Sequence, residues 1–147
     1  MTGHVGIAID SKTILHTSGR KGEPYPLAIS IKDWGKRYSK TKVIRPNSSS
    51  LGEKAATMAK KYFKGKKISY NIPSATLKGS KYTYCSQLVW KSYYKAGKSY
   101  ETASQIGNAG RLTWKVPLKI LPYDFSNKTY VKHNGFKFVK STWGKVQ

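Results

Sequence analysis

The sequence predicts one α+β domain spanning residues 1–147, in which short strands form an antiparallel sheet beside two amphipathic helices. Three observations predict this fold. Apolar residues alternate with small or polar ones over Gly3–Ile9, as in a half-buried strand. Apolar residues recur at helical spacing near residues 50–64 and 86–96. No stretch rich in Pro, Gly and Ser divides the 147 residues, which are enough for one domain with a hydrophobic core.

The N-terminal strand and its successor predict a hairpin that carries two histidines. After Gly3–Ile9, the turn residues 10–12 lead into a second strand over Thr13–Thr17. Side chains alternate between the faces of a strand, so any register whose paired numbers sum to an even value places His4 and His16 on one face. A sum of 20 would place them directly opposite each other. Two unrelated polar residues on a solvated face remain the alternative.

The first predicted helix runs from about residue 50 to 64. Ser50 and Glu53 have the spacing of a capping box, in which each side chain accepts a hydrogen bond from the other residue's backbone N–H. Gly65 would end the helix. The predicted core face consists of Leu51, Ala55, Met58, Ala59, Tyr62 and Phe63. Its lysines, Lys54, Lys60, Lys61 and Lys64, are expected to face solvent or a polyanion.

The remaining segments give weaker signals. Residues 27–34 predict a short strand or helix, and residues 42–45, 67–71 and 81–84 predict extended segments. Residues 99–111 predict a short helix or a loop, and residues 112–121 a strand that Pro117 interrupts. Asn134-Gly135 predicts a hairpin between strands at 129–132 and 136–139, which places His133 beside a surface turn without a role.

The only cysteine, Cys85, stands where an aromatic extended run becomes the second helix, which Gly97 would end. Unpaired backbone N–H groups and the positive end of the helix dipole stabilise a thiolate at such a position. We therefore expect a thiol with a depressed pKa that can act as a nucleophile. The alternative is a small buried hydrophobic residue, which is the commoner role of a lone cysteine.

The charge of the chain is strongly positive. Lys and Arg number 28 against six Asp and Glu, a formal net charge of +22. Such a field attracts nucleic acid, anionic lipid and the anionic polymers of a bacterial wall. Only four of the basic residues are arginines, the side chain that reads bases by bidentate contacts, which disfavours sequence-specific DNA recognition. A highly soluble lysine-coated surface is the simplest interpretation.

Several classes of site are not expected. One cysteine allows no internal disulfide and no cysteine-based zinc site, and the scattered acids and three histidines predict no metal site and no cofactor. No stretch is long and apolar enough to span a membrane, and no signal peptide is recognisable. We expect a monomer that is secreted or wall-associated, its export signal being absent from this sequence.

Cysteine catalysis needs a base that takes and returns the thiol proton, and a group that orients the base. If the sheet packs on the Cys85 helix, His4 can be the base and His16 its orienting partner. The motifs that carry these residues are Gly3-His4-Val5-Gly6-Ile7 and Tyr84-Cys85-Ser86-Gln87-Leu88-Val89-Trp90. Together they resemble the circularly permuted papain-like hydrolases of the NlpC superfamily. The YiiX/YycO-like branch is the most similar, and the lecithin:retinol acyltransferase group is a more distant relative.

The resemblance covers residues 3–97, with a weaker match at 121–125. It implies an antiparallel sheet packed against the nucleophile helix, with Cys85 as nucleophile, His4 as base and acid, and His16 as orienter. Many YiiX-like sequences have a glutamate in the third place, whereas the acyltransferase group has a histidine. Relatives also carry a strand before the Gly-His strand, so we expect either a truncated sequence or a sheet that is one strand short.

The oxyanion formed on attack needs hydrogen-bond donors. The backbone N–H of Cys85 at the helix start is one candidate. The hydroxyls of Tyr82 and Tyr84 are others, although aromatic packing is the more expected role of both side chains.

The sequence thus predicts a cysteine peptidase or amidase that acts on peptides, above all peptidoglycan stem peptides, through an acyl-thioester. Its lysine coat would hold it on an anionic wall polymer. One alternative is a thiol acyltransferase or lipase-like enzyme in peripheral contact with anionic membranes. Another is a non-enzymatic module that binds polyanions and does not depend on Cys85.

Overall fold

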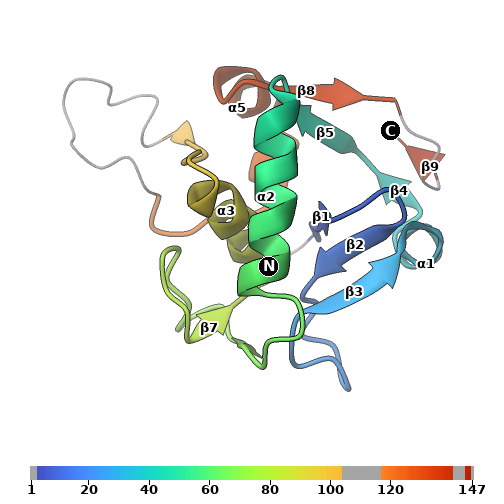
Figure 1. Ribbon diagram of the computed structural model, residues 1–147, viewed down its shortest axis with the longest axis vertical. Helices are drawn as coiled ribbons and strands as arrows, with labels where there is room; N and C mark the ends of the chain where they lie inside the picture. Colours follow the sequence, from blue (N-terminus) through green and yellow to red (C-terminus); the bar gives the residue numbers. More distant parts are fainter. Residues whose placement is uncertain (1–2, 104–116, 141–144, 147) are drawn as a thin grey trace.

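The computed structural model describes residues 3–103, 117–140 and 145–146, and it has the predicted mixture of helices and small sheets (Figure 1). The sheets are mostly antiparallel and short. Two helices, α2 and α3, pack against each other beside the N-terminal sheet.

The N-terminal residues form a three-stranded antiparallel sheet in the order β1, β2, β3. β1 spans Ile7–Ala8, β2 spans Thr13–His16 and β3 spans Leu27–Ser30. The predicted hairpin is confirmed, although its first strand, expected over Gly3–Ile9, is shorter. Alternation along the hairpin buries the apolar face and leaves the opposite face for other partners.

The register of the hairpin decides where the histidines lie. Ile7 pairs with Leu15, so the numbers of paired residues sum to 22. This even sum places His4 and His16 on one face, as predicted. They are offset diagonally by two positions and are not directly opposite, because the three-residue turn sets a sum of 22 instead of 20.

Both alternatives predicted for residues 27–34 occur, because a strand is followed directly by a helix. Helix α1, Ile31–Arg37, begins directly after β3, and the Ser30 hydroxyl caps it by accepting the Asp33 N–H at 3.0 Å. Its Trp34 side chain is buried against the sheet. A short strand β4, Lys40–Thr41, then leads to β5.

Helix α2 spans Ser49–Tyr62 and begins earlier than the sequence predicts. Its cap is Ser48, whose hydroxyl accepts the Leu51 N–H at 3.3 Å, so the capping box predicted at Ser50 and Glu53 is wrong. β5 ends at Pro46, and the helix starts so soon afterwards that Ser50 is already helical.

The faces of α2 are as predicted. Ala55, Ala59 and Phe63 are buried, and the neighbouring core-facing side chains are partly buried. The four lysines of the opposite face, Lys54, Lys60, Lys61 and Lys64, are exposed.

Helix α3 spans Cys85–Lys95, confirming the predicted cysteine helix. Gly97 follows its end with a φ of 100°, a conformation that glycine adopts without strain. Two short strands precede it: β6, Ser69–Tyr70, and β7, Tyr82–Thr83, which pair in parallel. The extended segments predicted at 67–71 and 81–84 therefore contain real strands.

The hairpin predicted around Asn134-Gly135 is wrong. Residues 128–133 form helix α5, Lys128–His133, and β8, Phe136–Val139, pairs antiparallel with β5, Val43–Pro46. The Asn127 side chain caps α5 by accepting the Tyr130 N–H at 3.0 Å.

Gly135 acts as a helix terminator and not as a hairpin turn. Its φ is 77°, and its N–H donates to the Lys132 carbonyl at the end of α5. The Asn134 side chain accepts the Glu101 N–H at 2.7 Å, which fixes the end of the helix to a distant segment. Tertiary contacts thus override the local turn preference.

Other C-terminal predictions have mixed outcomes. Residues 117–121 form no strand, contrary to the strand expected at 112–121, and residues 112–116 lie outside the described part. The segment 104–111 of the predicted helix or loop also lies outside it. A 3₁₀ helix η1, Pro122–Phe125, follows, and β9, Lys145–Val146, pairs in parallel with β4.

The core lies where α2, α3 and the inner face of the N-terminal sheet meet. Its fully buried large side chains come from segments far apart in the chain: Trp90, Tyr84, Tyr100, Phe63, Leu15, Leu88 and Ile120. Trp90 and Tyr93 of α3 are both buried in this core.

Candidate active site

Cys85 is the first residue of α3, and its side chain is 2% exposed. The backbone N–H of Val5 lies close enough to its sulfur to lower the pKa of the thiol. Val5 directly follows His4, so this contact joins the start of the cysteine helix to the histidine segment. The predicted packing of sheet on helix therefore brings the two motifs together.

The thiol does not have the depressed pKa that the sequence predicts. Burial raises the pKa of Cys85 above its ordinary value, and the N–H of Val5 and the Ser86 groups at the helix start only partly offset that effect. Desolvation of the charged sulfur therefore outweighs the helix terminus. The resting site holds a protonated thiol.

His4 and His16 form a direct pair. His4 Nε2 lies 2.8 Å from His16 Nδ1, and the rings meet edge to face with centroids 5.0 Å apart. Since His4 uses Nε2 for this contact, Nδ1 is the nitrogen left to exchange a proton with a substrate or nucleophile. This is the arrangement required of a base and its orienter.

Two aromatic rings from α1 and its C-terminal cap hold His4 in place. The His4 ring stacks on Tyr38 at a centroid distance of 4.8 Å and on Trp34 at 5.4 Å. The Tyr38 hydroxyl is close enough to Cys85 for a thiolate there to raise its pKa, although burial is the larger cause. Tyr38 therefore contacts His4 directly, and its hydroxyl would sense a charge on Cys85.

Both histidines are neutral at neutral pH. Burial, followed by the nearby charge of His16 and of two arginines, lowers the pKa of His4 to about 3. Burial, followed by the Arg37 charge, lowers the pKa of His16 to about 4. A neutral His4 can accept a proton, and the histidine pair stays uncharged until a proton is transferred to it.

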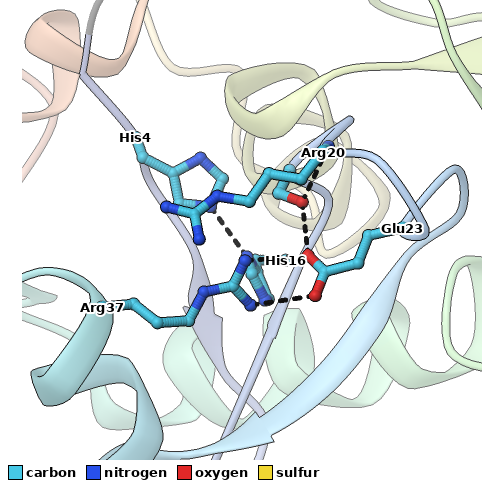
Figure 2. Close-up of polar contacts among 6 residues, drawn as sticks. His4, His16, Arg20, Glu23 and Arg37 are labelled. Carbon is cyan, nitrogen blue, oxygen red and sulfur yellow. Dashed lines mark hydrogen bonds and ion pairs between the residues drawn. The ribbon is translucent and has the colours of Figure 1, made fainter.

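An ion pair lies beside the histidines (Figure 2). Both Arg37 guanidinium nitrogens donate to Glu23, at 2.9 and 3.2 Å, and the Ser18 hydroxyl donates to the same carboxylate at 2.6 Å. These bonds lower the pKa of Glu23 to about 2. In Figure 2 the Arg20 side chain reaches toward His4, and it lies 5.6 Å over the Tyr38 ring.

If His4 acts as the base through Nδ1, a buried N–H of His16 is left without a hydrogen-bond partner among the described residues. For Nδ1 of His4 to act as base, its Nε2–H must donate to His16 Nδ1, which places the His16 proton on Nε2. His16 is fully buried, and its Nε2 has no hydrogen-bond partner among the described residues. Glu23, whose charge raises the pKa of His16, is the nearby carboxylate that could favour this tautomer.

The tyrosine candidates differ in position. Tyr84 is fully buried, and its hydroxyl accepts the Ile120 N–H at 3.2 Å, so it is engaged in the core. Tyr82 is partly buried, packs against the core and has the Lys81 ammonium 5.6 Å over its ring. The backbone N–H groups of Val5, Ser86 and Cys85 are the main-chain donors that lower the pKa of the thiol.

Buried polar contacts fix the start of α3. The Gln87 amide donates to the carbonyls of Leu77 and Thr76, at 3.1 and 3.2 Å, and its oxygen accepts from the Thr83 hydroxyl. The Lys91 ammonium donates to the Gly79 carbonyl at 2.7 Å. These bonds fasten the preceding loop to the helix that carries the nucleophile.

The predicted shared face of His4 and His16 is confirmed, but the sequence analysis did not predict the residues around this pair. Glu23 comes from the loop between β2 and β3, and the other three come from the short α1 and its C-terminal cap: Trp34, Arg37 and Tyr38. The spacing of Trp34 and Tyr38, four residues apart, is the only signal that could have placed two rings on one helix face.

The described residues contain neither a metal-binding cluster nor a membrane-spanning helix. No group of three or more His, Cys, Asp or Glu side chains there could hold a metal ion. None of the helices described is long and apolar enough to cross a membrane.

Comparison with known proteins gives one match. A family model described as "Lipoprotein N-acylation protein LnsA-like" matches residues 1–113, which include His4, His16 and Cys85. No curated protein and no solved structure matches. The match supports an enzyme of the cysteine acyltransferase or hydrolase type, and it does not confirm the YiiX/YycO-like branch.

Proposed function

Because the chain belongs to the LnsA-like family of lipoprotein N-acylation proteins, we propose that it is a cysteine acyltransferase acting in the cell envelope. Cys85 takes a fatty acyl group from an anionic membrane lipid as a thioester and passes it to the amine of a polypeptide. The observation that carries this proposal is the family match, which spans all three candidate catalytic residues.

In the first half-reaction His4 Nδ1 takes the proton of the Cys85 thiol while the sulfur attacks the ester carbonyl of the lipid. Attack by a neutral thiol with concerted proton transfer suits a buried sulfur whose pKa is raised. The N–H groups at the start of α3 stabilise the oxyanion. The C–O bond breaks, His4 returns its proton to the departing alcohol, and the acyl group remains on Cys85.

In the second half-reaction the acceptor amine attacks the thioester carbonyl. His4 takes a proton from the amine, the C–S bond breaks, and the proton returns to the sulfur. His16 holds the His4 ring through the 2.8 Å contact in both halves and stabilises the imidazolium that forms briefly. An amide and a free thiol result.

Hydrolysis of amide bonds in peptidoglycan stem peptides uses the same residues, with water instead of an amine resolving the thioester. The net charge of +22 suits an anionic wall polymer as well as an anionic membrane. The family match favours acyl transfer, so wall hydrolysis is the second candidate.

The first prediction tests the acyl-thioester. The protein is incubated with vesicles of phosphatidylglycerol, and intact-mass spectrometry should detect one acyl group on Cys85. Cys85→Ala should remove the adduct, because no other thiol exists in the chain. His4→Ala should slow its formation by at least about a hundredfold, the usual contribution of a general base.

Two comparisons distinguish the role of His16 from that of His4, and acyl transfer from wall hydrolysis. His16→Gln should slow the reaction less than His4→Ala, because it changes orientation and not the base. Muropeptides supplied in place of lipid should give no product. Release of stem-peptide fragments from muropeptides without any lipid-derived adduct would replace acyl transfer with wall hydrolysis.

A further inference from the structure

A large cavity lies between the N-terminal sheet and the β5–β8 pair. It has a volume of about 1490 Å³, and β1 lines one side while β5 and β8 line the other. Figure 1 shows β5 just above β1 in the view. Pockets for drug-sized ligands hold roughly 300–1000 Å³, so this one admits a longer ligand. His4 is among its lining residues, so the cavity reaches the candidate base.

The wall formed by β1 is an open strand edge. Among the described residues β1 is the outer strand of its sheet. The Ile9 N–H donates to the Thr13 carbonyl on the β2 side at 3.0 Å. Because main-chain groups of an antiparallel strand alternate in direction, those of Gly6 and Ala8 point away from β2. Both residues line the cavity.

These main-chain groups restrict what can occupy the cavity. An acyl chain would cover its apolar walls, such as Trp34 and Val43, but would leave the N–H and C=O groups of β1 without partners. An extended polypeptide presents donors and acceptors at the spacing of a strand and so satisfies them. The lining holds four basic residues, Lys40, Lys42, Arg45 and Lys137, against two acidic ones, Asp10 and Glu53, and this excess of positive charge favours a segment with acidic side chains.

We propose that the acceptor polypeptide binds here as an added strand along β1, with its amino end at His4. The proposal rests on the acyl transfer proposed above, in which His4 takes a proton from the acceptor amine. The chain of the acceptor then runs parallel to β1, and its second to sixth residues lie beside Gly6 and Ala8. Main-chain pairing gives affinity that tolerates different side chains, and the basic lining adds a preference for acidic ones.

Direct binding tests the strand without requiring activity. The probe is a fluorescent hexapeptide with a free amine at its first residue and aspartates beyond it, titrated against the Cys85→Ala protein. Each backbone amide from the second to the sixth residue is N-methylated in turn. N-methylation at alternate positions should weaken binding by tenfold or more, and the positions between them should have no effect.

The protein side has a matched pair of variants. Ala8→Pro removes an N–H that points into the cavity and leaves the β1–β2 bonds intact. Ala28→Pro removes an N–H from the opposite edge of the same sheet, since the Ile31 N–H donates to the Lys12 carbonyl and Ala28 therefore points away from β2. Only Ala8→Pro should weaken peptide binding by about tenfold.

Different results would contradict the binding of a peptide strand and the proposed acyl transfer. Equal binding of all N-methylated peptides would overturn the proposal that the acceptor binds as a strand along β1. Displacement of the peptide by palmitate would also overturn it, and would assign the cavity to the acyl chain. A missing thioester on Cys85 would instead refute the proposed acyl transfer. The N-methylated peptides would still test, independently of that result, whether a peptide binds along β1.

Discussion

At the scale of single residues, the site is held neutral by burial. Cys85, His4 and His16 all have pKa values shifted in the direction that disfavours charge. A permanent thiolate–imidazolium pair is therefore not the resting state. A neutral thiol in a closed site is protected from oxidants and alkylating agents until a substrate opens or fills the site.

The reactivity of the thiol follows from this state. Alkylation of Cys85 by iodoacetamide should be slow at pH 6 and rise only above the ordinary thiol pKa of about 8.5, because burial raises its pKa. Rates measured from pH 4 to 10 would show the inflection. Half-maximal reactivity near pH 5 to 6 would contradict the neutral site and restore the activated thiolate that the sequence predicts.

Stability should depend on pH through the same burial. The pKa of His16 is lowered from 6.5 to about 4, so the unfolded chain binds its proton at a higher pH than the folded chain. The contribution is complete above pH 6.5 and is lost as the pH falls toward 4, on the order of 3 kcal/mol. Urea unfolding between pH 7 and 4 should therefore show a shallower decline for His16→Gln than for the parent.

At the scale of elements, the sequence predicts best where one periodicity runs through a whole element. The faces of α2 and α3 follow from such patterns, and the parity of strand alternation pairs His4 with His16 without knowledge of the turn. Predictions fail where two local signals compete. The sequence Asn134-Gly135 is typical of both a hairpin turn and a helix end. Only the pairing of β8 with the distant strand β5 decides between the two.

The cap of α2 gives a prediction with an internal control. Ser48 accepts the Leu51 N–H, whereas Ser50 contacts only the Ser48 hydroxyl among the described residues, at 3.0 Å. Ser48→Ala should lower the free energy of unfolding by about 1 kcal/mol, and Ser50→Ala by only a few tenths. Chemical denaturation measures both. A larger loss for Ser50→Ala would restore the capping box predicted from the sequence.

The neighbours of the histidine pair could not be predicted, because they depend on how a loop folds back. Glu23 and Arg37 are 14 positions apart, and nothing in their spacing indicates an ion pair. The stacking of Tyr38 on His4 depends on α1 continuing directly from β3, which places its end over the hairpin.

At the scale of the whole molecule, charge dominates. A net charge of +22 on 147 residues creates an attraction to anionic surfaces that salt weakens. The lysines of the exposed α2 face contribute to it without touching the site. The attraction to an anionic surface and the chemistry of the site therefore depend on different residues.

This separation can be measured with vesicles. Binding to phosphatidylglycerol vesicles should be strong at low salt and mostly lost near 1 M salt, where screening acts within about 3 Å. Replacing Lys54, Lys60, Lys61 and Lys64 with Gln should weaken binding but leave the rate of thioester formation from detergent-dispersed lipid unchanged. Vesicle binding that is indifferent to salt would exclude the electrostatic explanation.

The pairing of β5 with β8 also bears on how the protein is made. These strands lie at residues 43–46 and 136–139, so one wall of the cavity combines a segment synthesised early with one synthesised late. The hairpin that carries both histidines is synthesised before its thiol partner, which follows about seventy residues later. Contacts between such distant segments form slowly and late in folding. A nascent chain therefore holds the histidine pair before the cavity is complete, and the cavity is assembled only after β8 has been synthesised.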